Sequence, residues 1–199
     1  MNIFILNAGR SGSSTFIHAC RHITNYTSAH ESRSGQLGCA RFAYPPDHIE
    51  ADNRLAWFLG RLDRTYGKNA FYVHMQRDVV DTAVSFVRRY QGGIIRAYRK
   101  TLLMGLAEDC SPMNVSVDYC DTVRSNIELF MRDKPNRMEF RLENANVDFR
   151  RFWEAIRAEG DLASALAEFR QHYNATSPPT AALLRKFGKI GRKLTNRLK

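Results

Sequence analysis

The segment from Gly9 to Thr15, Gly-Arg-Ser-Gly-Ser-Ser-Thr, has the composition of an anion-binding loop. It follows the apolar run Ile3 to Leu6, which is typical of a buried parallel strand, and helical composition resumes at Thr15. A strand that enters a Gly-rich turn and then a helix presents backbone N–H groups and the positive end of the helix dipole. Arg10 adds a guanidinium that can bind sulfate or phosphate through paired hydrogen bonds. The segment therefore predicts a site for a phosphate-like group.

The spacing of this loop differs from that of a nucleotide kinase. A kinase-type loop reads G-x-x-x-x-G-K-[ST], and its Lys reaches the terminal phosphates. Here only two residues separate Gly9 from Gly12, and no Lys precedes Ser13, Ser14 or Thr15. A small phosphotransferase that uses ATP is therefore disfavoured and is kept as an alternative. A Gly/Ser turn that merely links a strand to a helix is the structural alternative.

Arg77 and Ser85 form a second candidate anion site. The alternating run Ala70 to Met75 predicts a strand, and Val79 to Tyr90 has apolar residues at helical spacing. Arg77 then lies at the carboxyl end of a strand, and Ser85 lies about two helical turns further along. Either residue alone is explained by a salt bridge or a surface hydroxyl. The two at this spacing, downstream of the first loop, favour anion binding.

Both segments resemble motifs of the sulfotransferases. The first is similar to the loop that binds the 5′-phosphosulfate, commonly P-[KR]-[ST]-G-[ST]-[ST], with Ala8-Gly9 where that family often has Pro. The second, Arg77 to Ser85, is similar to the 3′-phosphate motif R-[DN]-P-x-[DE]-x-x-x-S, with Val79 in place of Pro. The resemblance covers these two segments and their spacing, and it is specific for the superfamily but not for any acceptor.

The resemblance implies an α/β fold in which helices flank a central parallel sheet, in the P-loop nucleotide-hydrolase-like architecture of sulfotransferases. It implies 3′-phosphoadenosine 5′-phosphosulfate (PAPS) as the sulfuryl donor, a hydroxyl or amine as the acceptor, and no metal ion. The donor-binding residues that it implies are Arg10, Ser11, Gly12, Ser13, Ser14, Thr15, Arg77 and Ser85.

Glu31 and His30 are the candidate general bases. They end or follow an expected short strand, Tyr26 to His30, close to where the first loop should lie. Several sulfotransferase families have a catalytic Glu here, and Glu31 is similar in position, whereas the imidazole of His30 titrates near neutral pH without help. Adjacent side chains of an extended segment point to opposite faces, so only one can reach the acceptor. We favour Glu31 as base, with Arg10 stabilising charge on the leaving oxygens; a plain ion pair of Glu31 with Arg33 or Arg10 is the structural alternative.

Length and composition agree with one such domain, which we expect over residues 1–176. The chain has 199 residues, and no run approaches the roughly 20 apolar residues that span a bilayer. The first residues lack the charged leader and cleavage site of a signal peptide. Four cysteines are scattered without a C-x-x-C pair, which is typical of free thiols in a reducing compartment. We therefore expect a cytoplasmic protein.

Residues 177–199 form a basic tail. They carry seven of the Lys and Arg residues and no acid, so they account for most of the net charge of +10. Apolar residues within 181–199 fall near helical spacing, so an amphipathic helix on an anionic membrane surface is one interpretation. A weak similarity of Arg185 to Gly191 to an R-K-G-x-x-G segment that helps hold the 3′-phosphate in cytosolic sulfotransferases is the second, and a solvated tail is the third. A non-enzymatic membrane- or nucleic-acid-binding module is therefore also kept as an alternative, although no specific nucleic acid is expected.

Elsewhere, strands and helices alternate, as in a parallel sheet whose ligands bind beyond the carboxyl ends of the strands. Both anion motifs follow such ends, so we expect them to converge on one nucleotide. The acceptor cannot be identified from the sequence, because its pocket would come from the variable loops 32–46 and 91–115. The remaining elements that the patterns predict are helices over 15–23, 47–66, 94–107, 118–132 and 148–158, a loop over 33–44 and a last strand over 138–142.

Overall fold

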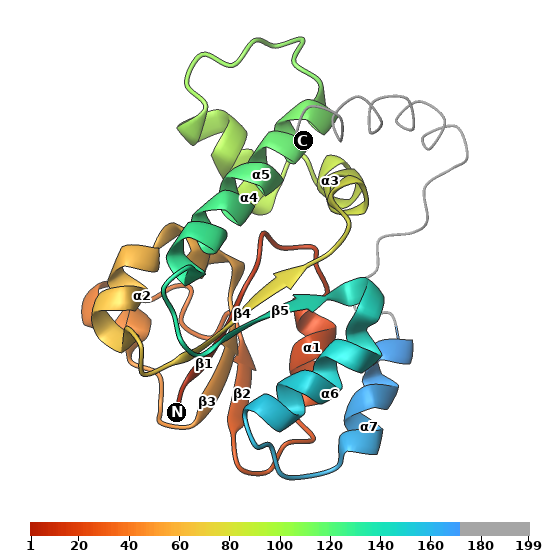
Figure 1. The fold of residues 1–199 in the computed structure, drawn as a ribbon. Coiled ribbons are helices and arrows are strands. Elements are labelled where there is room, and N and C mark those ends of the chain that lie inside the picture. Colours follow the sequence, from red (N-terminus) through yellow and green to blue (C-terminus); the bar gives the residue numbers. More distant parts are fainter. Residues whose placement is uncertain (172–199) are drawn as a thin grey trace.

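The sheet that carries both predicted motifs is entirely parallel. The computed structural model describes residues 1–171, and their five strands lie in the order β2-β3-β1-β4-β5 (Figure 1). The strands are β1 (Ile3–Leu6), β2 (Thr27–His30), β3 (His48–Ala51), β4 (Phe71–Gln76) and β5 (Arg137–Arg141). The predicted α/β class with a central parallel sheet is confirmed.

Helices cover both faces of this sheet (Figure 1). The α-helices are α1 (Ser13–Cys20), α2 (Leu59–Tyr66), α3 (Val79–Val87), α4 (Gly93–Ala97), α5 (Pro112–Met131), α6 (Ala145–Ala155) and α7 (Leu162–Ala167). Short 3₁₀ turns occur at Gly38–Phe42, Asn53–Trp57, Leu142–Asn144 and Glu168–Arg170, and a π-helical turn occurs at Tyr98–Leu102. No helix within residues 1–171 has both the length and the apolar composition needed to cross a bilayer.

Strand β1 is the centre of the fold and is buried on both faces. All four of its side chains are fully buried, because Ile3 and Ile5 contact one layer of helices while Phe4 and Leu6 contact the other. A strand covered on both sides needs apolar residues at every position rather than at alternate ones. This explains the unbroken run Ile3 to Leu6 that precedes the loop.

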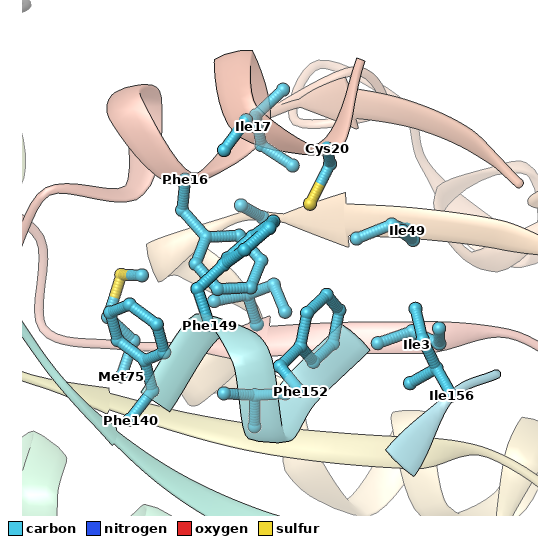
Figure 2. Close-up of a cluster of buried hydrophobic side chains, with 14 of the residues drawn as sticks. Ile3, Phe16, Ile17, Cys20, Ile49, Met75, Phe140, Phe149, Phe152 and Ile156 are labelled. Carbon is cyan, nitrogen blue, oxygen red and sulfur yellow. The ribbon is translucent and has the colours of Figure 1, made fainter. Parts of the chain in front are cut away.

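One face is packed by α1, α6 and α7 around phenylalanines (Figure 2). The ring of Phe16, on α1, lies 4.9–5.3 Å from the rings of Phe140, Phe149 and Phe152. Tilted and edge-to-face contacts at these distances add to the free energy gained from burial. The cluster fixes α1 against the sheet, and α1 begins directly after the predicted anion loop.

The other face is packed by α2, α3, α4 and α5 around tyrosines. Tyr119, on α5, is fully buried and its hydroxyl donates a hydrogen bond of 2.7 Å to the carbonyl oxygen of Ala8. Burial of a Tyr is favourable when its hydroxyl keeps a partner. Helix α5 therefore supports the residue just before the loop.

The helix predicted over 47–66 is wrong. The segment instead contains β3, the 3₁₀ turn Asn53–Trp57 and the shorter helix α2. Strand β3 lies between β1 and β2, and its residues Glu50 and Ala51 are fully buried. A buried Glu made this strand look like the polar face of an amphipathic helix.

Other boundaries differ more modestly. The first helix begins at Ser13 and ends at Cys20 rather than covering 15–23, and the helix predicted over 94–107 is replaced by α4 and the π-helical turn that follows it. Helix α5 begins at Pro112, six residues before the predicted start, because the Ser111 side chain caps it by accepting from the Met113 N–H. The predicted loop over 33–44 contains a 3₁₀ turn. The basic tail 177–199, with its proposed membrane contact, lies outside the described residues.

Candidate functional site

The loop between β1 and α1 has the backbone shape of an anion-binding turn. Gly9, Arg10 and Gly12 have positive φ angles of 90°, 60° and 91°. The Asn7 side chain holds this shape, since its Oδ1 accepts from the Gly9 N–H at 2.8 Å and from the Ser11 hydroxyl at 3.2 Å. Gly12, at the N-cap of α1, has no side chain with which to cap the N–H groups of the first turn. Such a turn at a helix N-terminus attracts an anion.

Both glycines of the loop are favoured by their positive φ angles and have close neighbours. A Cβ on Gly9 would lie 2.6 Å from Nδ2 of Asn53, and a Cβ on Gly12 would lie 2.7 Å from a methyl group of Leu142. Both distances are shorter than real Cβ contacts, and the positive φ angles add strain for any other residue. The loop is thus held between the turn that follows β3 and the turn that follows β5.

The structure brings the two predicted anion motifs together. Nε of Arg10 donates a hydrogen bond of 2.9 Å to Oγ of Ser85, which is buried at the second turn of α3. Nη1 of Arg77 lies 3.5 Å from the carbonyl oxygen of Arg10, and its Nη2 lies 3.5 Å from the Asp81 carboxylate. Residues 75 positions apart therefore share one site at the carboxyl ends of β1 and β4.

Positive charge is concentrated at this site. The pKa of Arg10 is lowered, first by burial of the guanidinium and then by the nearby charges of Arg89 and Arg77. A guanidinium stays protonated after such a shift, so the shift reports mutual repulsion rather than loss of charge. A bound anion would relieve that repulsion.

Helix α3 holds Ser85 in place through its own N-terminus. The Asp78 carboxylate caps the helix by accepting from the Asp81 N–H at 3.0 Å, and the Asp78 N–H donates to the Glu143 carboxylate at 2.8 Å. Capping of this kind stabilises a helix by about 1 kcal/mol. The residues Asp78 and Glu143 thereby link α3 to the turn after β5, next to the loop.

Glu31 and His30 both lie beside the loop but contact different partners. Nε2 of His30 is 2.9 Å from Oγ of Ser13, a residue of the first motif. Oε2 of Glu31 is 2.6 Å from Nη1 of Arg54, and Glu31 has a positive φ of 52°. The structural alternative named Arg33 or Arg10 as the ion-pair partner of Glu31, whereas the structure pairs Glu31 with Arg54.

Glu50 fixes the segment that contains Glu31. Its fully buried carboxylate accepts hydrogen bonds of 2.7 Å from both the N–H and the hydroxyl of Ser32, and it lies 3.0 Å from Nε2 of His48. A buried carboxylate is tolerated when its oxygens have such partners. The residue directly after Glu31 is thus anchored to the middle of β3.

The buried carboxylate of Asp52 anchors Arg54, as that of Glu50 anchors Ser32. The Asp52 carboxylate forms an ion pair with the buried Arg41, and its Oδ1 accepts from the Arg54 N–H at 2.8 Å. Glu50, Asp52 and Arg54 were all missed in the sequence because they fell within the predicted helix over 47–66. The alternation of polar His48 and Glu50 with apolar Ile49 and Ala51 was the signal that could have identified the strand.

A pocket opens beside Arg10 on the side of β3. Its volume is about 670 Å³. It is lined by Arg10, by Asn53 and Arg54 after β3, by residues 86–95 at the end of α3 and the start of α4, and by Pro112. The Glu31–Arg54 pair therefore lies at the edge of a pocket that also contains Arg10. No group of three or more His, Cys, Asp or Glu side chains that could bind a metal ion occurs within residues 1–171.

Comparison with known proteins supports the fold. No protein-family model matches the sequence, and no curated protein matches it. Among solved structures, the chain is similar to a sulfotransferase domain from the curacin biosynthetic pathway, with a TM-score of 0.56 and 17% sequence identity. The similarity covers 88% of this chain and 80% of that one. This likeness, together with the parallel order of the strands, shows that residues 1–171 have the α/β fold of a sulfotransferase domain.

Proposed function

We propose that the protein is a sulfotransferase that moves a sulfuryl group from PAPS to a hydroxyl or amine acceptor. The observation that carries this proposal is the hydrogen bond between Arg10 and Ser85. It joins the segment similar to a 5′-phosphosulfate loop to the segment similar to a 3′-phosphate motif, in a fold like that of a sulfotransferase domain. One nucleotide with phosphates at both ends would span the two.

The loop would hold the 5′-phosphosulfate. The N–H groups of residues 11–15 and the N-terminus of α1 supply hydrogen-bond donors, and Arg10 supplies a charge. Arg77 and Ser85 would hold the 3′-phosphate, for which the Ser85 hydroxyl would exchange its contact with Arg10 for one with the phosphate. The narrow fit of Gly9 and Gly12 suits a loop that a phosphate group approaches at the backbone.

Glu31 would act as the general base. In the transfer, the acceptor oxygen or nitrogen forms a bond to sulfur while the bond from sulfur to the bridging oxygen of the 5′-phosphate breaks. The acceptor proton goes to the Glu31 carboxylate, and adenosine 3′,5′-bisphosphate (PAP) leaves. Arg10 and the loop N–H groups would stabilise the charge that develops on the leaving oxygens. His30 stays the alternative base, although its contact with Ser13 suits a role in orienting the donor loop.

Thermal unfolding with PAP tests the donor site directly. The wild type, Arg77→Gln and Arg150→Gln are each heated with PAP, with ADP or with Mg-ATP. Arg150 is an exposed residue of α6, so its substitution removes the same charge away from the site. PAP at about 100 times its dissociation constant adds about 2.7 kcal/mol of stability, which raises the Tm by about 5–11 °C for a domain near this size.

The expected result is a metal-independent shift with PAP that Arg77→Gln loses and Arg150→Gln keeps. A shift with Mg-ATP alone would replace the proposal with a phosphotransferase. No shift with any of the three ligands would favour a basic binding module, whose affinity for anionic surfaces should fall steeply with salt.

A further inference from the structure

The ion pair between Glu31 and Arg54 is anchored at both ends by buried carboxylates. Glu50, on β3, is fully buried and accepts at 2.7 Å from the N–H of Ser32, the residue after Glu31. Asp52, directly after β3, is also fully buried and accepts at 2.8 Å from the N–H of Arg54. These two carboxylates lie two positions apart in the chain, so they fix the backbones of both ion-pair partners relative to each other.

The backbone of Glu31 is held in a conformation that residues other than glycine rarely adopt. Its φ is 52°, and its N–H donates a hydrogen bond of 3.0 Å to the carbonyl oxygen of Ala51 on β3. Such a conformation persists where the surrounding structure enforces it, and it occurs most often at functional sites. The surroundings of Glu31 thus determine where its side chain starts.

Stability alone does not explain this arrangement. The side chains of the pair are partly exposed, 31% for Glu31 and 38% for Arg54. An ion pair with that exposure contributes little to folding, whereas each buried carboxylate is costly to desolvate. Two buried carboxylates therefore support an ion pair that adds little stability, and its geometry is what they secure.

This geometry places the Glu31 carboxylate beside the donor loop. Nη1 of Arg54 lies 2.6 Å from Oε2 of Glu31, and among residues 1–171 no hydrogen bond to Oε1 occurs. Arg54 lines the same pocket as Arg10, and its neighbour Asn53 approaches the loop at Gly9. The turn after β3 therefore contacts the donor loop through one residue and the candidate base through the next.

We propose that Arg54 is the positioning residue of the general base. The inference rests on the proposed sulfuryl transfer with Glu31 as base, and it adds a residue that acts through Glu31. Arg54 holds Oε2, so that Oε1 is directed towards the hydroxyl or amine of the acceptor and receives its proton. Arg54 itself neither gives nor takes a proton in this step, because a guanidinium stays protonated.

A double-mutant cycle tests whether Arg54 acts through Glu31. The variants are Arg54→Gln, Glu31→Gln and the two combined. The rate measured is the release of PAP from PAPS with water as the acceptor, so no other acceptor has to be identified. We expect Arg54→Gln to lower kcat about 10- to 100-fold at an unchanged KM for PAPS, since a misplaced catalytic group costs about that much. In the Glu31→Gln background the same substitution should have no further effect.

Two further variants are the controls of this cycle. Arg54→Lys keeps the positive charge and should restore part of the rate, whereas Arg151→Gln breaks an ion pair of α6 and should leave the rate unchanged. An equal loss from Arg54→Gln with and without the Glu31 carboxylate would overturn the inference, because Arg54 would then act independently. A raised KM for PAPS at unchanged kcat would also overturn it, because it would place Arg54 at the nucleotide.

Crystal structures of the wild type and Arg54→Gln with PAP separate this inference from the proposed function and need no turnover. PAP bound at Arg77 and Ser85 would support the donor site by itself. We expect the Glu31 carboxylate to lie beside Arg54 in the wild type and to be turned away or disordered in Arg54→Gln. A Glu31 side chain in the same place in both structures would overturn the inference and leave the donor site intact.

Discussion

The two halves of the site differ in the partners of their charged side chains. The β1–β4 half, defined by Arg10, Arg77 and Ser85, pairs its guanidiniums with a hydroxyl and a backbone carbonyl, and its carboxylate contact, to Asp81, is long at 3.5 Å. The β2–β3 half, defined by Glu31, Glu50, Asp52, Arg41 and Arg54, pairs every carboxylate with a cation or an N–H group.

This difference assigns anion binding to the β1–β4 half and stabilisation of the fold to the β2–β3 half. Charges that already have protein partners rigidify the β2–β3 half and are costly to disturb. The repulsion of Arg10 by Arg77 and Arg89 in the β1–β4 half costs stability, and a bound anion would relieve it. Substitutions in the two halves should therefore differ in what they damage: folding in one, anion affinity in the other. Glu31 is the exception, because it belongs to the supported half and is expected to do chemistry.

Glu31→Gln should give the largest effect. Although Glu31 lies in the β2–β3 half, its substitution should reduce activity rather than stability. The amide keeps the shape but cannot accept the acceptor proton, so turnover of PAPS with a hydroxyl or amine acceptor should fall about 10²- to 10⁴-fold. PAP binding, measured by thermal shift, should be unchanged. A similar loss in His30→Gln but not in Glu31→Gln would make His30 the base instead.

Asp52→Asn should strongly destabilise the fold. It leaves the buried Arg41 guanidinium without its counter-charge, and breaking a buried pair in this way costs about 3–5 kcal/mol. The free energy of unfolding can be measured by urea titration monitored by fluorescence. Ser85→Ala, in the other half, is the matched comparison and should cost far less. Equal losses in the two variants would contradict the division of the site.

The pH dependence of the unfolding free energy tests the stability of the β1–β4 half, because His74 lies on β4. Burial of the imidazole lowers the pKa of His74 from its ordinary 6.5 to about 4. His74 binds a proton more readily in the unfolded state than in the folded state. Its contribution to the free energy of unfolding is therefore complete above about pH 6.5. About 3 kcal/mol is lost as the pH falls towards about 4. His74→Gln should flatten the profile of unfolding free energy between these pH values. An unchanged slope would assign the acid sensitivity to other groups.

Ser85→Ala should give the smallest effect and act on affinity alone. The proposed 3′-phosphate site loses one neutral hydroxyl donor, which is worth about 1 kcal/mol, or about fivefold in the dissociation constant of PAP. Isothermal titration calorimetry would measure this change. Ser164→Ala, at the start of α7, is a control that removes a hydroxyl far from the nucleotide and should leave PAP affinity unchanged.

The β1–β4 half was readable in the sequence because its signals are local. Gly9 and Gly12 mark the turn, an unbroken apolar run marks β1, and Arg77 follows a clear strand. The β2–β3 half was not readable, because the partners that make Glu50 and Asp52 acceptable in the core, among them Arg41, come together only in the folded chain. Its charged residues therefore suggested a surface helix. The ion pair between Glu31 and Arg54 joins residues of separate loops and has no sequence signature.

The close packing of the loop against Asn53 and Leu142 has a consequence for the kinetics of ligand binding. Contacts within the protein, from Asn7, Asn53 and Leu142, hold the positive φ angles of the loop, so little conformational entropy is lost when an anion binds. Association with the nucleotide should therefore follow a single exponential whose rate rises linearly with ligand concentration, with no slow ordering step. The amide hydrogen of Gly9, which already donates to Asn7, should exchange with solvent almost as slowly before binding as after it.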